Sequence, residues 1–197
     1  MDKRMLRSRT RLKECFISLI NKKAFNEITV TELCQQAGLN RSTFYAHYDD
    51  IYDLHESIQK ELYDEFDETL RTYLSEDTLW LSSLFNPDTE EKIPVLKEIL
   101  IFIERNQDIF RHFFTVGNDL NFLDRFFDKG REHYWDSIRE SLPDYDPTII
   151  NYYYTFVANG TVGLIKDWVI GGFREEPDEL EHLVHRFITQ GFTPQKK

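Results

Sequence analysis

The chain is 197 residues long, 41% hydrophobic and 15% aromatic, so it can bury a core and suits one small domain followed by a larger one. Its net charge of −11 would by itself argue against a nucleic-acid partner. The longest apolar run is the five residues 99–103, which excludes a transmembrane helix and a signal-peptide core, so we expect a cytoplasmic protein with no membrane partner.

The chain begins with a basic segment that is predicted to be helical. Residues 1–48 hold nine basic and four acidic side chains, so the excess of negative charge lies in the rest of the chain. A small basic module on an acidic body is typical of phosphate binding, although many basic N-termini are only solvated tails. The apolar residues that recur at helical spacing are Leu12, Cys15, Phe16, Leu19 and Ile20. The nine basic residues are Lys3, Arg4, Arg7, Arg9, Arg11, Lys13, Lys22, Lys23 and Arg41.

Residues 29–54 predict a short helix, a tight turn and a second short helix that opens onto a third. Thr29 followed by Glu32 is a capping box for the first of these helices. Gly38 ends that helix, because glycine adopts φ > 0 at little cost, and Asn40 is a good N-cap for the next one. Two short helices joined in this way form a helix-turn-helix, which lays its second helix in the major groove of DNA.

Three short motifs lie within this segment, Ala37-Gly38-Leu39-Asn40, Thr43-Phe44-Tyr45 and His47-Tyr48. Ala24-Phe25 and Ile28-Thr29-Val30 precede them. Together these residues resemble the tetracycline-repressor (TetR) family of bacterial one-component regulators, and the resemblance covers the first quarter of the chain. It implies a homodimer that binds a near-palindromic operator in double-stranded DNA.

The resemblance also implies which side chains contact DNA. Base contacts specify a sequence, whereas phosphate contacts position the protein. Arg41 and Ser42 are expected to face base edges. The residues expected to contact mostly phosphates are Thr43, Tyr45 and His47, with Thr29 and Thr31 helping from the preceding helix.

A long helix is expected to follow, capped by Asp50 with Asp53 three residues on, and to end near Leu74. Relatives usually place a phosphate-binding lysine at the position of Ile51. Ile51 can offer no charge, so either this contact is lost or Ile51 is a packing residue. The sequence leaves both alternatives open.

Past this point the chain predicts helix after helix and no strand of useful length. The fold class is therefore all-α. The resemblance implies a three-helix helix-turn-helix domain at 1–49 and a larger helical effector-binding and dimerisation domain at 50–197. Further helices are expected at 94–106, 107–115 and 119–141, after a loop with a short helical piece at 75–92.

The last two helices carry a second informative pattern. Asp146-Pro147 begins a helix that Gly171-Gly172 ends. A heptad seam runs along it through Ile150, Tyr154, Val157, Thr161, Leu164 and Trp168. Gly160 and Gly163 each cost about 1 kcal/mol relative to alanine in mid-helix, and close approach of another backbone would compensate. Pro177 begins the final helix, whose inward residues are Leu180, Leu183, Val184, Phe187 and Ile188.

TetR-like proteins dimerise through a four-helix bundle of their last two long helices, and this pair resembles that element. A seam within one chain is the alternative. The interface predicted from the resemblance comprises Val157, Gly160, Gly163, Leu164, Trp168, Leu183 and Phe187. Residues 151–170 also resemble the branch that includes the activator of a dihydroxyacetone-kinase operon.

Aromatic residues crowd the middle helices and are candidates for an effector pocket. In relatives the effector occupies an apolar cavity among such helices, the usual form of a small-molecule site. Aromatic residues at helical spacing are, however, more often plain core, and control by a partner protein is a further alternative. The candidate pocket residues are Phe102, Phe113, Phe126, Tyr134, Tyr153 and Phe156.

A helical metalloenzyme is the alternative from another class. Glu179-x-x-His182, with His185 nearby, is one copy of a spacing that di-iron bundles use twice, together with two further glutamates. With one copy present, a solvated helix face is the better interpretation. Cys15 and Cys34 lack a CxxC pairing and read as core residues in a reducing compartment. We therefore expect no enzymatic activity, no catalytic residue, no metal and no cofactor.

Overall fold

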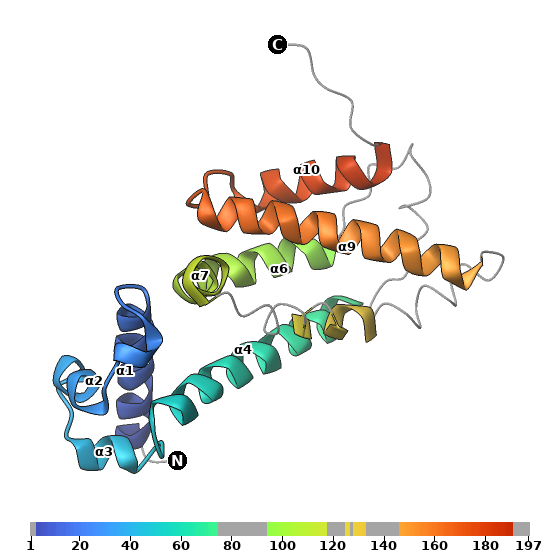
Figure 1. Ribbon diagram of the computed structural model, residues 1–197. Coiled ribbons are helices and arrows are strands. Elements are labelled where there is room, and N and C mark those ends of the chain that lie inside the picture. Colours follow the sequence, from blue (N-terminus) through green and yellow to red (C-terminus); the bar gives the residue numbers. More distant parts are fainter. Residues whose placement is uncertain (1–2, 75–93, 118–124, 127, 133–145, 191–197) are drawn as a thin grey trace. The chain divides into compact units, whose positions relative to one another are not determined.

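The computed structural model describes residues 3–74, 94–117, 125–126, 128–132 and 146–190 (Figure 1). Its regular elements in these ranges are all helical, as the sequence predicts. They are α1 (Lys3–Ile20), the 3-10 turn η1 (Phe25–Glu27), α2 (Val30–Ala37), α3 (Arg41–Tyr45), α4 (Ile51–Leu74), α6 (Pro94–Arg105), α7 (Gln107–His112), the π-helical η2 (Phe113–Gly117), α9 (Pro147–Ile170) and α10 (Pro177–Gln190). The expected loop at 75–92 and most of the expected helix at 119–141 lie outside the described residues. None of the described helices is both long and apolar enough to cross a membrane.

The chain divides into two compact units. The N-terminal unit is Met1–Asp64 together with Gln107–Asp119, and the C-terminal unit is Glu65–Asn106 together with Leu120–Lys197. The long helix α4 therefore begins in the first unit and ends in the second. The division into 1–49 and 50–197 is a functional one and stays a prediction.

Helix α1 forms the centre of the N-terminal unit and packs on α2 and α7. Its predicted inward face is confirmed, because all five apolar residues of that face are buried. The largest side chains that reach zero exposure in this unit are Leu12, Phe16, Leu33, Phe44 and Leu54.

The C-terminal end of α1 is tied to α7 by two side chains. His112 Nδ1 lies 3.1 Å from the Ile20 carbonyl oxygen, and Asn21 Nδ2 donates to the Asp108 carbonyl oxygen at 3.1 Å. Carbonyl groups near a helix end lack intrahelical partners, so His112 satisfies one of them. Burial lowers the pKa of His112, an effect that its hydrogen bond with Ile20 opposes.

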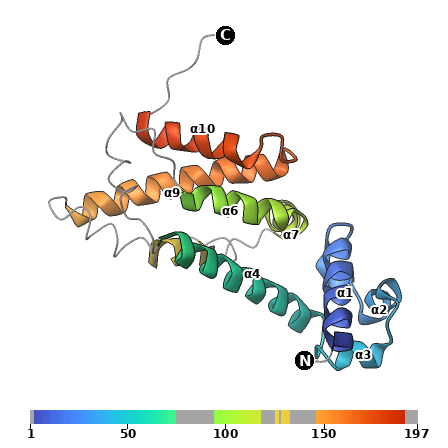
Figure 2. The ribbon, with the colours of Figure 1, turned by 180° about the vertical axis from the view of Figure 1, so that it is seen from behind.

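In the C-terminal unit, α10 packs against both α6 and α9 (Figure 2). Asp146 caps α9 as predicted, since its carboxylate accepts from the Thr148 N–H at 2.7 Å. Helix α9 ends at Ile170, directly before the predicted glycine pair. The side chains with at most 1% exposure that fill this unit are Leu70, Val95, Leu100, Val169, Glu181 and Val184.

Candidate nucleic-acid interface

The turn between α2 and α3 has the geometry that the sequence predicts. Thr29 is the N-cap of α2, and its Oγ1 accepts from the Glu32 N–H at 3.2 Å. Gly38 ends α2 at φ 66° and ψ 33°, where a side chain would strain the backbone. Asn40 occupies the N-cap position of α3, but among the described residues its side chain makes no capping hydrogen bond. The Glu32 carboxylate forms an ion pair with Lys23, which the capping-box pattern did not predict.

Helix α3 is five residues long and is held to its unit by one side chain. Phe44 is 0% exposed, whereas Arg41, Ser42 and Tyr45 are exposed and Thr43 is half-buried. Thr29 and Thr31 at the start of α2 are also exposed. The Thr29 oxygen serves the cap, so its hydroxyl proton is available to donate outward. Six of the seven predicted DNA-binding side chains therefore lie exposed or half-exposed on this helix pair, and their roles stay predictions.

Two of the predicted contacts, Arg41 and Tyr45, also contact one another. Arg41 Nη2 donates to the Tyr45 hydroxyl at 3.3 Å, and its guanidinium lies 5.8 Å from the Tyr45 ring centroid. This hydrogen bond raises the pKa of Arg41, so the guanidinium keeps its charge. The side chain predicted to read bases is thus steadied by one predicted to hold phosphate.

The seventh residue, His47, lies in the connection between α3 and α4 and has a partner within the protein. Its Nε2 is 2.7 Å from Ser8 Oγ, and the Ser8 hydroxyl donates to the Met5 carbonyl oxygen at 2.9 Å. If that hydroxyl proton goes to Met5, Ser8 accepts from a protonated Nε2 of His47. Burial, and then the charge of Arg9, lower the pKa of His47.

Ile51 begins α4 and is 7% exposed. Of the two alternatives for this residue, the structure supports packing. The start of α4 is closed by reciprocal bonds, as Asp50 Oδ1 accepts from the Asp53 N–H at 2.8 Å and Asp53 Oδ2 accepts from the Asp49 N–H at 2.9 Å. This cap was predicted for Asp50 and Asp53, and it places two carboxylates close to Ile51.

Part of the positive charge of residues 1–48 is neutralised by ion pairs within the chain. Arg9 and Lys13 both contact Glu61, and Lys23 contacts Glu32. The nine basic residues therefore overstate the positive charge that this unit offers to phosphate. Sequence spacing gives no sign of this, because Glu61 lies about fifty positions along the chain from its two partners.

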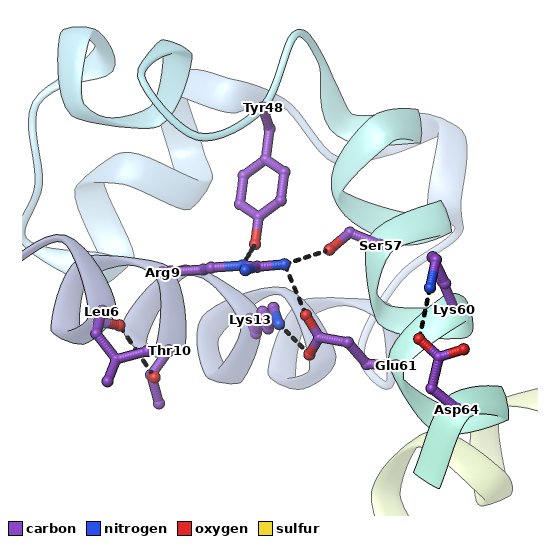
Figure 3. A network of polar contacts seen from close by, with 9 residues as sticks. All are labelled: Leu6, Arg9, Thr10, Lys13, Tyr48, Ser57, Lys60, Glu61 and Asp64. Atoms are coloured by element: carbon purple, nitrogen blue, oxygen red, sulfur yellow. Dashed lines mark hydrogen bonds and ion pairs between the residues drawn. The ribbon is translucent and has the colours of Figure 1, made fainter. Parts of the chain in front are cut away.

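A network around Arg9 was also missed by sequence reasoning (Figure 3). Arg9 Nε donates to the Tyr48 hydroxyl at 3.3 Å, and Arg9 Nη2 donates to Ser57 Oγ at 3.2 Å and to Glu61 Oε1 at 2.7 Å. These contacts join α1, the α3–α4 connection and α4 within the N-terminal unit. Tyr48 belongs to the His47-Tyr48 motif of the sequence, and this motif is the feature that could have drawn attention to the network.

The predicted pocket residues that the structure describes belong to both units of the chain. Phe66 brings two of them together in the C-terminal unit, with ring centroids 5.9 Å from Phe102 and 4.5 Å from Phe126. Burial raises the pKa of Tyr153, which lies on α9 in the same unit. Phe113 instead belongs to the N-terminal unit, where its ring lies 5.8 Å from that of His112. Tyr134 lies outside the described residues.

Helix α9 has two apolar faces, and among the described residues one of them is buried and the other is exposed. The predicted seam is the inward face, where Ile150 is 4% and Trp168 is 3% exposed. Burial also raises the pKa of Tyr154, on the same seam, to about 12. Phe156 is 78% exposed on the other face, so it does not line the interior as predicted. Exposed residues of that outer face are Ile149, Tyr152, Phe156, Gly160, Gly163 and Ile170.

Glu179, the first residue of the Glu179-x-x-His182 spacing, caps the start of α10. Glu179 Oε2 accepts from the Glu176 N–H at 3.2 Å, at the start of α10. His182 is exposed whereas His185 is 5% exposed, so the two histidines lie on different faces. Within the ranges that the structure describes, no three His, Cys, Asp or Glu side chains gather in a way that could hold a metal ion.

Comparison with known proteins adds a family and a fold. A family model described as "Transcriptional regulator C-terminal region" matches residues 90–190, half of the chain. No curated protein matches the sequence.

Three solved structures share the fold over nearly their whole length. The TetR transcriptional regulator from Streptococcus agalactiae 2603V is 20% identical, with a TM-score of 0.57 over 96% of this chain and 97% of that one. The transcriptional regulator FadR from Bacillus subtilis, in complex with stearoyl-CoA, is 12% identical, with a TM-score of 0.65 over 93% and 99%. The dihydroxyacetone kinase operon activator DhaS is 15% identical, with a TM-score of 0.58 over 92% and 93%. At these identities the likeness establishes the fold alone.

Proposed function

The chain belongs to the TetR family of transcriptional regulators, and we propose that it binds an operator through α3 as a two-fold dimer under the control of a small-molecule effector. The observation that supports DNA binding is that α3 has one buried apolar side chain and several exposed polar ones. Phe44 is buried in the unit, while the polar side chains of Arg41, Ser42 and Tyr45 are exposed. A short helix anchored in this way is suited to the major groove.

Within this proposal, Arg41 and Ser42 read base edges, and Thr43, Tyr45 and His47 hold phosphates with help from Thr29 and Thr31. Tyr45→Phe then removes the hydroxyl that holds phosphate, while the ring that Arg41 lies against stays in place. Phosphate contacts carry no sequence information directly. We therefore expect this variant to bind all duplexes more weakly, without favouring new sequences.

Selection from a pool of random DNA duplexes tests the proposal directly. A two-fold dimer that reads successive major grooves should enrich a near-palindrome whose half-site centres are about 34–36 Å apart, or a multiple of that distance. The control is a duplex pool challenged with protein in which Phe44 is replaced by aspartate, because α3 then loses its anchor. If the wild-type protein enriches no sequence, operator binding is wrong for this chain.

The proposed dimer surface is the outer face of α9. Tyr152 is 67%, Phe156 78% and Ile170 50% exposed on this face, and large exposed apolar patches mark interaction sites. In the described part of the chain, nothing lies within 4 Å of a Cβ built on Gly160 or Gly163. Two such helices could therefore approach closely at the glycines. Trp168 packs inside its own chain and is removed from the predicted interface, while Val157, Leu164, Leu183 and Phe187 stay as its half-buried borders.

The proposed effector is a molecule with a long apolar chain. Its support is the likeness in fold to a regulator crystallised with stearoyl-CoA and the contact of Phe66 with Phe102 and Phe126 in the C-terminal unit. The excess of acidic residues outside 1–48 disfavours a strongly anionic head group, so we assign recognition to the acyl chain.

Thermal unfolding and operator binding, measured with stearoyl-CoA, stearate or coenzyme A, show whether the protein recognises the acyl chain or the head group. A ligand that binds the folded protein raises its thermal midpoint. We expect both acyl compounds to do so and to change operator affinity, whereas coenzyme A does neither. If coenzyme A alone reproduces the effect, or if no acyl compound has any effect, the acyl chain is not what is recognised.

A further inference from the structure

Two consecutive residues of α1 hold two consecutive residues of the connection between α3 and α4. Ser8 Oγ lies 2.7 Å from His47 Nε2, and Arg9 Nε donates to the Tyr48 hydroxyl at 3.3 Å. Ser8 is 8% and Tyr48 4% exposed, so both contacts are made at the edge of the core. The segment that follows the recognition helix is therefore fixed from α1.

Arg9 extends the same attachment to α4. Its Nη2 donates to Ser57 Oγ and to Glu61 Oε1, while Lys13 contacts the second oxygen of the Glu61 carboxylate (Figure 3). A guanidinium carries donors in a rigid planar fork that can serve several acceptors in different directions. A lysine ammonium at this position is a single point and could not reach all three partners at once.

Tyr48 passes this constraint to the recognition helix. Its ring lies 5.8 Å from the ring of Phe44, at an angle of 49°. Phe44 is the buried residue of α3, and a helix of five residues has little stability of its own. The angle at which α3 is presented thus depends on what packs against Phe44.

We propose that Arg9 is a positioning residue for operator recognition: it holds Tyr48, and through Tyr48 and Phe44 the helix α3, at a fixed orientation to α4. The inference rests on the proposed function, since it matters only if α3 reads DNA. It reassigns Arg9, which its charge alone would place among phosphate contacts. Recognition needs the contacting side chains held within about 0.5 Å, and that demands locked supporting residues.

The sign of one substitution separates the two roles. Glu61→Ala removes a negative charge beside Arg9 and Lys13, so simple electrostatics predicts tighter DNA binding. If Arg9 positions α3, Glu61→Ala releases the Arg9 fork and operator binding becomes weaker. The matched control is Asp64→Ala, which removes the same charge one turn further along α4, where the carboxylate forms an ion pair with Lys60.

Arg9→Lys and Tyr48→Phe complete the test, since the first keeps the charge and the second keeps the ring. Fluorescence anisotropy should give operator dissociation constants about fivefold higher for Glu61→Ala, Arg9→Lys and Tyr48→Phe, the scale of one ordinary hydrogen bond. Affinity for a random duplex should not change for Arg9→Lys and Tyr48→Phe, and the Arg9→Lys/Tyr48→Phe double variant should lose little more than either single one, because the two residues act through one contact. Thermal unfolding followed by circular dichroism identifies a temperature at which every variant is folded, and the binding measurements are made at that temperature.

The inference is wrong if Glu61→Ala tightens operator binding as Asp64→Ala does, or if Arg9→Lys binds the operator as wild type. It is also wrong if Arg9→Lys weakens operator and random duplex equally. Failure of the wild-type protein to bind any operator would instead refute the proposed function, so the two failures can be told apart.

Discussion

Replacing Ile51 with lysine should destabilise the N-terminal unit and leave the salt dependence of DNA binding unchanged. Ile51 is 7% exposed at the first position of α4. Burial of an isoleucine side chain contributes about 1.5–3 kcal/mol relative to leaving it exposed. A longer lysine forced into the same space adds about 1–3 kcal/mol of strain. We therefore expect the free energy of unfolding to fall by about 3 kcal/mol or more.

Urea unfolding followed by circular dichroism measures this loss. Ile51→Met is the control, since it nearly conserves volume and should cost less than about 1.5 kcal/mol. The same proteins are then titrated with operator at several salt concentrations. If Ile51→Lys keeps its stability, and the plot of log affinity against log salt steepens by about 0.9 per added phosphate contact in each subunit, residue 51 faces DNA and the packing argument is refuted.

Three further predictions concern the dimer, the pH response and the turn. Phe156→Glu places a charge on the outer face of α9 and should yield monomers in sedimentation, whereas Thr155→Glu beside it should stay dimeric; a dimeric Phe156→Glu would move the interface elsewhere. Burial lowers the pKa of His112 and His47, so the unfolded chain binds more protons, and stability is lost as pH falls through the unfolded value of about 6.5. The urea midpoint should therefore be lower at pH 5.5 than at pH 7.5, and His112→Gln should reduce the difference; a midpoint that rises on acidification would contradict this. Gly38→Ala should cost about 1–2 kcal/mol, because φ is 66° there; an unchanged urea midpoint would show that the turn relaxes.

The helix-turn-helix could be predicted because its signals are local. Thr29 and Glu32 are three residues apart, and Gly38 stands directly after α2, so capping and chirality rules suffice to place the turn. The same holds for Asp50 and Asp53 at the start of α4. Each of these signals lies within one helical turn of its partner, which is the range over which sequence patterns are reliable.

The faces of α9 could be separated only in part. The sequence predicted the periodic seam but left two uses for it, a dimer interface or packing within one chain, and Ile150 and Trp168 on this seam are buried within the chain. Phe156 is equally apolar but is exposed, and periodicity cannot tell which of two apolar faces turns inward. The partners of Arg9 were out of reach for another reason. Tyr48 lies 39 and Glu61 lies 52 positions along the chain from Arg9, and no spacing rule connects helices so far apart.

The most direct test of operator reading is base preference in Arg41→Ala. Arg41 is exposed on α3, as a side chain that contacts base edges must be. Loss of one such contact should cost about 1–3 kcal/mol at the preferred base and relax the preference at one position in each half-site. Lys22→Ala removes the same charge from an exposed position outside the helix pair and should keep the ranking of operator variants. If Arg41→Ala ranks operator variants in the same order and with the same spacing as wild type, α3 does not read bases through Arg41, and the central claim is contradicted.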